Sequence, residues 1–562
     1  MAYSGLWGKR SFAFTACIIF SNLSILAQEN SPQTRENSWG SLTGTSGADV
    51  WYYMKDPKSG AQFVEDRVRM NSFLQLMYKK GGFSAGLRYE AYLPKPILGI
   101  DPRFEGQGIA FRFAAYEWKG LEVTAGSFYE QFGNGLIFRA YEARPLGFDN
   151  FVDGFRIKYN LKGLHLKALA GRMRNFWNWS PGYIRGGDAE FNLAEISPRV
   201  AKSKFNCIVG GSFMGKYQGD KELILGNEIL QLPQNVGAWS GRATLVAGAF
   251  SLSAEYAAKI NDPSVVNNYI YKPGQALLVT VNYAAPNVGF SLGAKRVDNM
   301  DFRTSRYVTG NEQLINWIPM LNKQHTYMLA ASIYPYAVQY MGENGLQAEL
   351  QVAIPKGSKL GGKYGMDINL NGSIVYGLDT LNGTSRGGYK SRLLGVGQQY
   401  YHDFNVELSK KFSKKWKLNL MYMKLFTNLN VVPVSQLPSP PPSVSAHIGV
   451  MDVAWRITTD HNLRLELQSL YTRDDGGSWL FSLLEYTLAP HWFVSFMNQY
   501  NVGHPDPAKR IHYPMGSAGY NMGNHRFQLS AGRQRAGILC IGGVCRAVPA
   551  ATGVTLSYIG TF

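Results

Sequence analysis

Apolar and polar side chains alternate with a period of two residues over much of the chain. One stretch shows the pattern plainly, alternating apolar with small or polar side chains: Phe83, Ser84, Ala85, Gly86, Leu87 and Arg88. A period of two places successive side chains on opposite faces of a β-strand, so each stretch has one apolar and one polar face. The pattern predicts a succession of amphipathic strands.

The alternation recurs through the sequence and is interrupted by connections of two lengths. Short polar turns such as Lys119-Gly120 and Lys162-Gly163 separate many strand pairs, and longer connections such as 175–188, 298–324 and 431–444 separate others. Short turns that alternate with long loops are typical of outer-membrane barrels, with the turns in the periplasm and the loops outside the cell. With about ten residues per crossing, we expect roughly 22 to 26 strands. Between 334 and 398, no single assignment of faces fits the turns on both sides.

A membrane location fits the pattern better than a soluble sheet does. After residue 27 no run approaches the roughly 18 apolar residues of a membrane helix. A closed barrel is the other structure that satisfies its backbone groups in lipid. The predicted fold is therefore all-β, a single large antiparallel transmembrane β-barrel over 48–562. The alternative is a soluble β-protein in which the apolar faces pack against each other.

The first residues look like a cleavable secretory signal. Lys9 and Arg10 precede the apolar stretch 11–26, which ends at Ala27. A membrane anchor is the weaker interpretation because the stretch is short and contains polar residues. Cleavage would leave a short segment, 28–47, ahead of the first strand. We expect no room there for a globular plug preceding the barrel.

The last residues look like the closing strand of an outer-membrane barrel. Four side chains share its apolar face: Val554, Leu556, Tyr558 and Phe562. We expect this strand to direct insertion by the barrel-assembly machinery. The predicted location is the cell outer membrane, with outer-membrane lipid as the surrounding partner and other envelope proteins as further partners.

The net charge of the chain is strongly positive. Lys and Arg number 57 against 39 Asp and Glu, a formal net charge of +18. These basic residues are dispersed over strands and turns rather than gathered on one helix or arm, so nucleic-acid binding is not expected. The basic side chains that lie opposite apolar neighbours are predicted to line the lumen: Arg67, Arg69, Arg88, Arg112, Arg139, Arg156 and Lys158. Rings of Arg or Lys favour anions.

Three cysteines follow the signal. Cys540 and Cys545 flank a Gly-Gly pair, as in a tight turn, and in an oxidising envelope they are predicted to form a disulfide. A zinc half-site is the alternative, but it lacks a second ligand pair. Cys207 is expected to be unpaired.

Catalytic and cofactor motifs are not expected. Residues 357–363 read G-x-x-x-x-G-K, but Tyr364 stands where a phosphate loop needs Ser or Thr. The nine His residues form no spaced metal set. We therefore predict no enzyme activity, no metal and no cofactor.

Two stretches carry a resemblance to a known family. They are FYEQFGNGL at 128–136, continued by RAYEARPLG at 139–147, and the ending that runs from GRQRAG at 532–537 through the cysteine pair to Arg546 and Pro549. The chain resembles a family of large outer-membrane proteins of Bacteroidota that has no assigned biochemical activity. The resemblance implies the fold and the location, and it transfers no catalytic residue.

Two functions remain open at the level of sequence. The leading hypothesis is a channel or transport pore for small polar or anionic solutes, because a large barrel with basic inward side chains suits that role. The alternative is a structural or assembly scaffold within an outer-membrane secretion or surface-lipoprotein complex.

Overall fold

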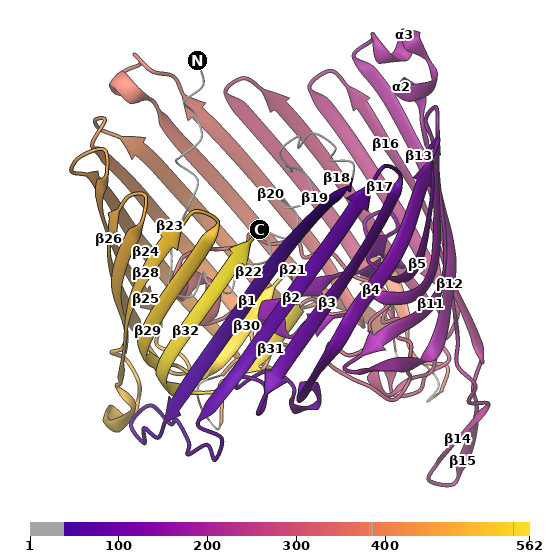
Figure 1. Cartoon of the computed structure of the whole chain (residues 1–562), viewed down its shortest axis with the longest axis horizontal. Helices are drawn as coiled ribbons and strands as arrows, with labels where there is room; N and C mark the ends of the chain where they lie inside the picture. Colours follow the sequence, from indigo (N-terminus) through magenta and orange to yellow (C-terminus); the bar gives the residue numbers. More distant parts are fainter. Residues whose placement is uncertain (1–38, 382, 384–385, 436, 438, 543) are drawn as a thin grey trace.

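The computed structural model shows a closed antiparallel barrel of 24 strands (Figure 1). The first strand pairs with the last, Ala48 opposite Tyr558, and this pairing closes the ring. The structure describes residues 39–562 except 382, 384, 385, 436, 438 and 543. The predicted all-β fold and its strand number are confirmed. The predicted signal, 1–27, lies outside the described residues.

The barrel strands, in chain order, have these bounds: β1 (Ser41–Met54), β2 (Val68–Lys80), β3 (Phe83–Leu93), β4 (Gly106–Trp118), β5 (Leu121–Phe128), β10 (Val152–Leu161), β11 (Leu164–Asn175), β12 (Asn178–Asn192), β13 (Phe205–Tyr217), β16 (Asn235–Ala247), β17 (Phe250–Lys259), β18 (Gly274–Ala285), β19 (Val288–Asp298), β20 (Gly342–Ile354), β21 (Met366–Leu381), β22 (Lys390–Lys411), β23 (Trp416–Asn428), β24 (Ser443–Arg456), β25 (His461–Tyr471), β26 (Trp479–Leu488), β27 (Trp492–Asn501), β28 (His512–Met522), β29 (His525–Gln534) and β32 (Ala551–Thr561). The barrel thus starts at Ser41 rather than at Ala48, because the small and polar residues 41–47 hide the alternation.

The remaining elements lie in the connections: β6 (Glu130–Gln131), β7 (Arg139–Ala140), β8 (Glu142–Ala143), β9 (Phe148–Asp149), β14 (Glu222–Leu225), β15 (Glu228–Gln231), β30 (Gly537–Ile541), β31 (Val544–Val548), α2 (Leu193–Ile196), α3 (Pro198–Ala201), α4 (Met328–Ser332) and the 3-10 turns η1 (Pro102–Phe104), η2 (Arg144–Leu146), η3 (Val265–Asn267), η4 (Gly362–Tyr364) and η5 (Pro507–Lys509). Among the described residues, every helix is too short or too polar to cross a membrane.

The two ends of the barrel differ. The short turns lie at one end, together with α2 and α3, which we call the short-turn end (top of Figure 1). The other end, the long-loop end, carries the longer connections and the projecting β14–β15 hairpin. The expected long connection at 175–188 is instead a tight turn at Phe176 and Trp177 followed by β12. Phe176 makes that turn with a φ of +56°.

The outer face of the wall is apolar, as the alternation predicts. On β25, Leu465 and Leu467 are 37% and 39% exposed, whereas Glu466 and Gln468 between them are 3% and 4% exposed. The exposed leucines therefore point away from the lumen and the polar residues point into it. Nearer the long-loop end the inner face is apolar as well, and Leu470 is 1% exposed.

Arg112 was predicted to face the lumen, but a β-bulge in β4 places its side chain on the outer face. Along β3 and β4 the register skips one residue: Arg88 pairs with Phe111, but Tyr89 pairs with Ile109. The extra residue reverses the alternation, so Phe111 turns inward and packs beside Phe151. Arg112 consequently lies on the outer face, with its side chain 56% exposed and 3.6 Å from Asp153.

The region 334–398 resisted assignment for two physical reasons. Its first residues, up to 341, belong to a long connection that packs inside the barrel rather than to the wall. Farther along, the β21–β22 pairing shifts register three times between Val375 and Thr380. Each shift changes which side chains face the lumen, so no single parity holds across the region.

Candidate functional site: the segments that fill the lumen

Four connections from the long-loop end fold into the barrel (Figure 1). We name their described residues segment I (129–151), segment II (299–341), segment III (429–442 without 436 and 438) and segment IV (535–550 without 543). Segment I includes β6–β9, segment II includes α4, and segment IV is the β30–β31 hairpin. Together they fill the long-loop half of the lumen.

Segments II and III pack on the inner face of β21–β27 through apolar side chains. Leu329 and Ile333 of segment II and Val432 of segment III share one buried cluster with Ile448 and Leu470 of the wall. Each of these five side chains is at most 4% exposed. Here the inner wall is one side of a protein core rather than the polar lining of a water-filled channel.

Segments I and II form a second apolar cluster on the opposite part of the wall. Phe132 and Phe138 of segment I and Phe302 of segment II pack with Met214 and Ala257 on β13 and β17. All five are fully buried. The apolar inner faces of these strands are therefore explained by the segments that cover them.

A buried ion network fixes segment I to the wall. Arg88 Nε lies 2.6 Å from Glu90 Oε1, and Arg174 Nη2 lies 2.7 Å from Glu90 Oε2. Asp149 of segment I accepts from both arginines, at 2.7 Å from Arg174 Nη1. The Tyr129 hydroxyl donates to the same carboxylate at 2.9 Å. Burial makes these contacts strong only as a complete set, because an unpaired charge here is costly.

The same network contains a carboxylate group that resembles a metal site. Oxygen atoms of Glu90, Glu142 and Asp149 all lie within 4.8 Å of one another. Arginines already pair with each of them, including Arg144 Nε at 2.6 Å from Glu142 Oε1. The negative charge that would attract a cation is thus neutralised, and the group carries no metal assignment.

A second ion network fixes segment II to β13 and β17. Lys216 Nζ lies 2.6 Å from Asp262 Oδ2, and Arg306 Nε of segment II lies 3.3 Å from Asp262 Oδ1. Lys259 Nζ donates to the carbonyl of Asp301 at 2.7 Å. Burial alone would raise the pKa of Asp262, but attraction by Lys216, Lys259 and Arg306 outweighs it and lowers that pKa below its usual value.

Acid should loosen this attachment. A carboxyl group whose pKa is lower in the folded state stabilises the folded state at any pH above its pKa in the unfolded chain, which is about 4. This stabilisation is lost as the pH falls from that value through the pKa of the folded state. We expect the hydrogen-exchange protection of residues 299–306 to be constant from pH 5 to 7 and to fall below about pH 4. The variant Asp262→Asn should show low protection at every pH. Equal protection of the wild type at pH 3 and pH 6 would contradict the assignment.

Segment IV is a disulfide-bridged hairpin at the centre of the filling. Cys540 and Cys545 face each other across β30 and β31 and are joined in a disulfide. Its polar contacts reach the other inserted segments: Arg546 Nε donates to the Pro145 carbonyl at 2.7 Å, and Asn311 Nδ2 donates to the Cys545 carbonyl at 2.5 Å. The hairpin therefore holds segments I and II together.

Reduction should weaken the hairpin without unfolding the wall. A disulfide across so short a loop contributes about 2 kcal/mol by restricting the unfolded state. Reduction should therefore lower exchange protection of residues 537–548 about 30-fold and leave the barrel strands unchanged. The Cys540→Ser/Cys545→Ser variant should have the low protection and no response to reductant. Unchanged protection on reduction of the wild type would show that the disulfide does not stabilise the hairpin.

The short-turn half of the lumen is lined by paired charges. Arg156 Nη2 lies 2.5 Å from Glu122 Oε1, and Arg242 Nη1 lies 2.8 Å from Asp188 Oδ1. Lys167 Nζ lies 2.8 Å from Glu130 Oε1. Glu122 and Lys167 keep 29% and 28% of the side chain accessible, whereas Arg156, Arg242, Asp188 and Glu130 of segment I are 3–12% accessible. This half is a polar vestibule of mixed charge.

The basic residues predicted to line the lumen are distributed over several environments. Four lie on the inner side of the wall: Arg69, Arg88, Arg156 and Lys158. Arg139 lies in segment I, stacked 4.4 Å from the Tyr141 ring and 4.2 Å from the Trp317 ring. Arg67 precedes β2 and lies exposed 5.4 Å from the Phe63 ring. Arg112 faces outward, as described above.

The predicted C-terminal residues lie at the seam of the barrel. On β32, Val554, Leu556 and Tyr558 share one face, with Leu556 50% exposed on the outside. Phe562 follows the strand and exchanges backbone hydrogen bonds with Gly44 of β1, at 2.7 Å and 2.9 Å. The seam is therefore hydrogen-bonded beyond the end of β32.

Solved structures with a similar course of the chain include a siderophore receptor, an usher translocation pore and an outer membrane protein. The siderophore receptor PirA from Pseudomonas aeruginosa is 11% identical, with a TM-score of 0.42 over 94% of this chain and 81% of that chain. The translocation pore of the P pilus usher PapC is 8% identical, with a TM-score of 0.39 over 93% and 99%. The outer membrane protein OpdK from Pseudomonas aeruginosa is 12% identical, with a TM-score of 0.35 over 82% and 99%.

Curated proteins give no match in sequence. A family model does match, over residues 9–562, and it is described as a family of unknown function, DUF6029. This match covers nearly the whole sequence, so the chain belongs to the DUF6029 family.

Proposed function

We propose that the protein is an outer-membrane transport pore that segments I to IV hold closed at the long-loop end, and that it passes polar solutes when segment IV moves. One observation carries the proposal: the lumen is a polar vestibule in its short-turn half and is blocked by inserted segments in its other half. A polar lining suits a solute path, and a barrel of this strand number has room for both a path and a plug.

Segment IV is the part best suited to move. Its buried apolar side chains, Leu539, Val544 and Val548, pack with Ala143, Leu146 and Phe148 of segment I in a small cluster separate from the two wall clusters. Segments I to III contribute buried side chains to the large clusters on the wall, whereas segment IV reaches them only through the partly buried Ile538. Displacing the hairpin therefore leaves the buried side chains of the two wall clusters in place.

The solute follows from the charges of the vestibule. Arginine and lysine side chains there pair with carboxylates, as Arg242 does with Asp188 and with Glu190 at 3.0 Å. Paired charges leave a polar lining without a strong preference for one sign, because selectivity rings need a single sign of charge. This pairing favours small polar solutes over the anion-selective pore suggested by the basic residues alone.

The proposed orientation places the short turns in the periplasm and the long loops outside a Bacteroidota cell. In that orientation the vestibule opens to the periplasm and segments I to IV close the pore from the cell surface. Insertion by the barrel-assembly machinery through the β32 seam is part of the same proposal.

Conductance of the intact protein in planar bilayers tests the proposal. We expect the intact pore to be closed in buffer and to open reversibly in urea at concentrations that leave the wall folded, because inserted loops unfold before the closed sheet. In a salt gradient the reversal potential should lie near zero. A barrel that stays closed until the wall itself unfolds would refute the pore, and a strong preference for one ion sign would refute the polar-solute assignment.

An assembly scaffold is the second candidate, and exposed apolar residues on β22 favour it. Leu393, Leu394 and Val396 are 70%, 94% and 61% exposed where β22 extends at the long-loop end. Exposed apolar patches of this kind mark protein contacts. A stoichiometric partner that co-purifies with the native protein and is lost in Leu394→Asp would support a scaffold. Purification without a partner would support the pore.

A further inference from the structure

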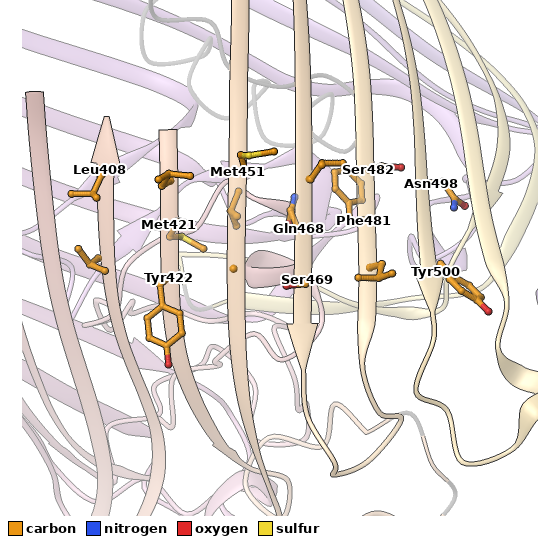
Figure 2. A pocket seen from close by; sticks show the side chains of 16 residues that line it. Leu408, Met421, Tyr422, Met451, Gln468, Ser469, Phe481, Ser482, Asn498 and Tyr500 are labelled. Carbon is orange, nitrogen blue, oxygen red and sulfur yellow. The ribbon is translucent and has the colours of Figure 1, made fainter. Parts of the chain in front are cut away.

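A groove crosses the outer face of the wall over strands β22 to β27, and Figure 2 shows the side chains that line it. Its volume is about 710 Å³. Leu408 and Tyr422 stand at one side and Asn498 and Tyr500 at the other, with Ser469 between them. The groove lies on the face that the proposed membrane covers, outside the lumen.

Small residues form the floor of the groove. Strand register places Tyr422 opposite Gly449 and Gly449 opposite Ser469, so two small residues sit side by side on neighbouring strands. A methyl group built at Gly449 would have as its nearest neighbour the Ser469 hydroxyl oxygen, at 3.5 Å. The depression therefore has room for added atoms directly above Gly449.

The side toward the short-turn end is apolar. One row closer to that end, Leu420 lies opposite Met451, and Met451 lies opposite Leu467. All three side chains are exposed on the outer face, at 39%, 38% and 39%. A hydrocarbon chain in the groove would contact apolar side chains along this side.

The side toward the long-loop end is polar and basic. There Lys424 lies opposite His447, and His447 lies opposite Tyr471. The Tyr422 hydroxyl and His447 Nδ1 are 2.7 Å apart, which places the imidazole at the rim of the groove. Within the described part of the chain, Lys424 forms no ion pair with a carboxylate. A lysine at this level can attract a lipid headgroup.

We propose that the groove binds one anionic lipid, with an acyl chain above Gly449 and Ser469 and the headgroup against Lys424 and His447. Both halves of the ligand are matched: the apolar row contacts the chain, and the free cation lies toward the headgroup region of the leaflet at the long-loop end. A polar rim on a lipid-facing wall is costly unless it has a partner, and an anionic headgroup provides one.

Native mass spectrometry with defined lipids tests this proposal. The full-length protein is exchanged into detergent with equal amounts of phosphatidylglycerol and phosphatidylcholine of the same chain length. We expect one retained phosphatidylglycerol. Gly449→Trp should abolish its retention by filling the groove. Lys424→Gln should reduce the preference for phosphatidylglycerol over phosphatidylcholine about five-fold, the contribution of one lysine near a membrane surface.

Ala114→Trp is the matched control, because Ala114 is exposed on β4, outside the groove. It should retain the lipid, and heat-modifiable migration in gels should show that each variant is folded. Equal retention by Gly449→Trp and wild type would refute the groove as the site. An unchanged preference in Lys424→Gln would refute the headgroup contact. A dimer that Gly449→Trp dissociates would show that a second copy occupies the groove, and would overturn the proposal. None of these results depends on conductance.

Discussion

A variant in which a short Gly-Ser turn replaces residues 535–550 is expected to conduct ions continuously in planar bilayers, whereas the intact protein stays closed. The replacement removes the hairpin that joins segments I and II, including the hydrogen bond from Arg546 to the Pro145 carbonyl. The small cluster around Leu146 then loses half of its side chains, and the centre of the lumen is vacated. A barrel of 24 strands with a partly emptied lumen should have a conductance comparable with that of aqueous porins.

The matched control is the replacement of residues 222–231 by a similar turn. This removes the β14–β15 hairpin, which projects from the barrel and fills none of the lumen (Figure 1). The control variant should stay closed. A folded barrel that lacks residues 535–550 and still does not conduct would show that segment IV is not what closes the pore.

Asp149→Asn is expected to destabilise the closed arrangement of segment I by about 3–5 kcal/mol. The carboxylate is 7% exposed and pairs with both Arg88 and Arg174, each 2% exposed, so the variant removes one of the two carboxylates that these buried cations share and leaves only Glu90 in that role. Hydrogen-exchange protection of residues 129–151 should fall about 100-fold or more. Spontaneous openings in bilayers should become more frequent.

Asp379→Asn is the matched control for Asp149→Asn, because it removes the carboxylate of an exposed ion pair instead of a buried one. Asp379 pairs with Arg392 at 3.2 Å, but the arginine side chain is 63% exposed. An exposed pair contributes at most about 1 kcal/mol, so this variant should exchange and conduct like the wild type. Similar effects of the two substitutions would contradict a closure held by buried ion pairs.

The wall could be predicted from the sequence because the alternation within each strand indicates which side chains face the lumen and which face outward. The exposed Leu465 and Leu467 and the buried Glu466 of β25 follow directly from a period of two. The inserted segments could not be predicted in this way, because their inward folding depends on contacts between residues far apart in the chain. A signal was present on β23, where Leu420 and Met421 are neighbours and both faces of the strand are apolar. A strand apolar on both faces needs a second apolar partner inside the barrel.

The candidate site was predicted only in part, again for local reasons. Alternation placed Arg88 and Arg156 inside, but it gave no account of the carboxylates that pair with them, such as Asp149. Arg112 was assigned to the wrong face because a single extra residue in β4 reverses the alternation. Register shifts of this kind leave no mark in the sequence pattern.

The two stretches that carry the family resemblance acquire a structural meaning. Residues 128–147 fall largely in segment I, and residues 532–549 fall largely in segment IV. These two segments pack against each other through Leu146 and Leu539, among others. The distinctive sequence thus lies in the material that fills the lumen rather than in the wall.

An electron cryo-microscopy map of the protein in lipid nanodiscs tests the central claim most directly. We expect a continuous ring of 24 strands with the β1–β32 seam closed and density for segments I to IV inside its long-loop half. The short-turn half should be open to solvent. A lumen empty along its whole length, or two stacked sheets that bury the leucine rows of β25 against each other, would contradict the account.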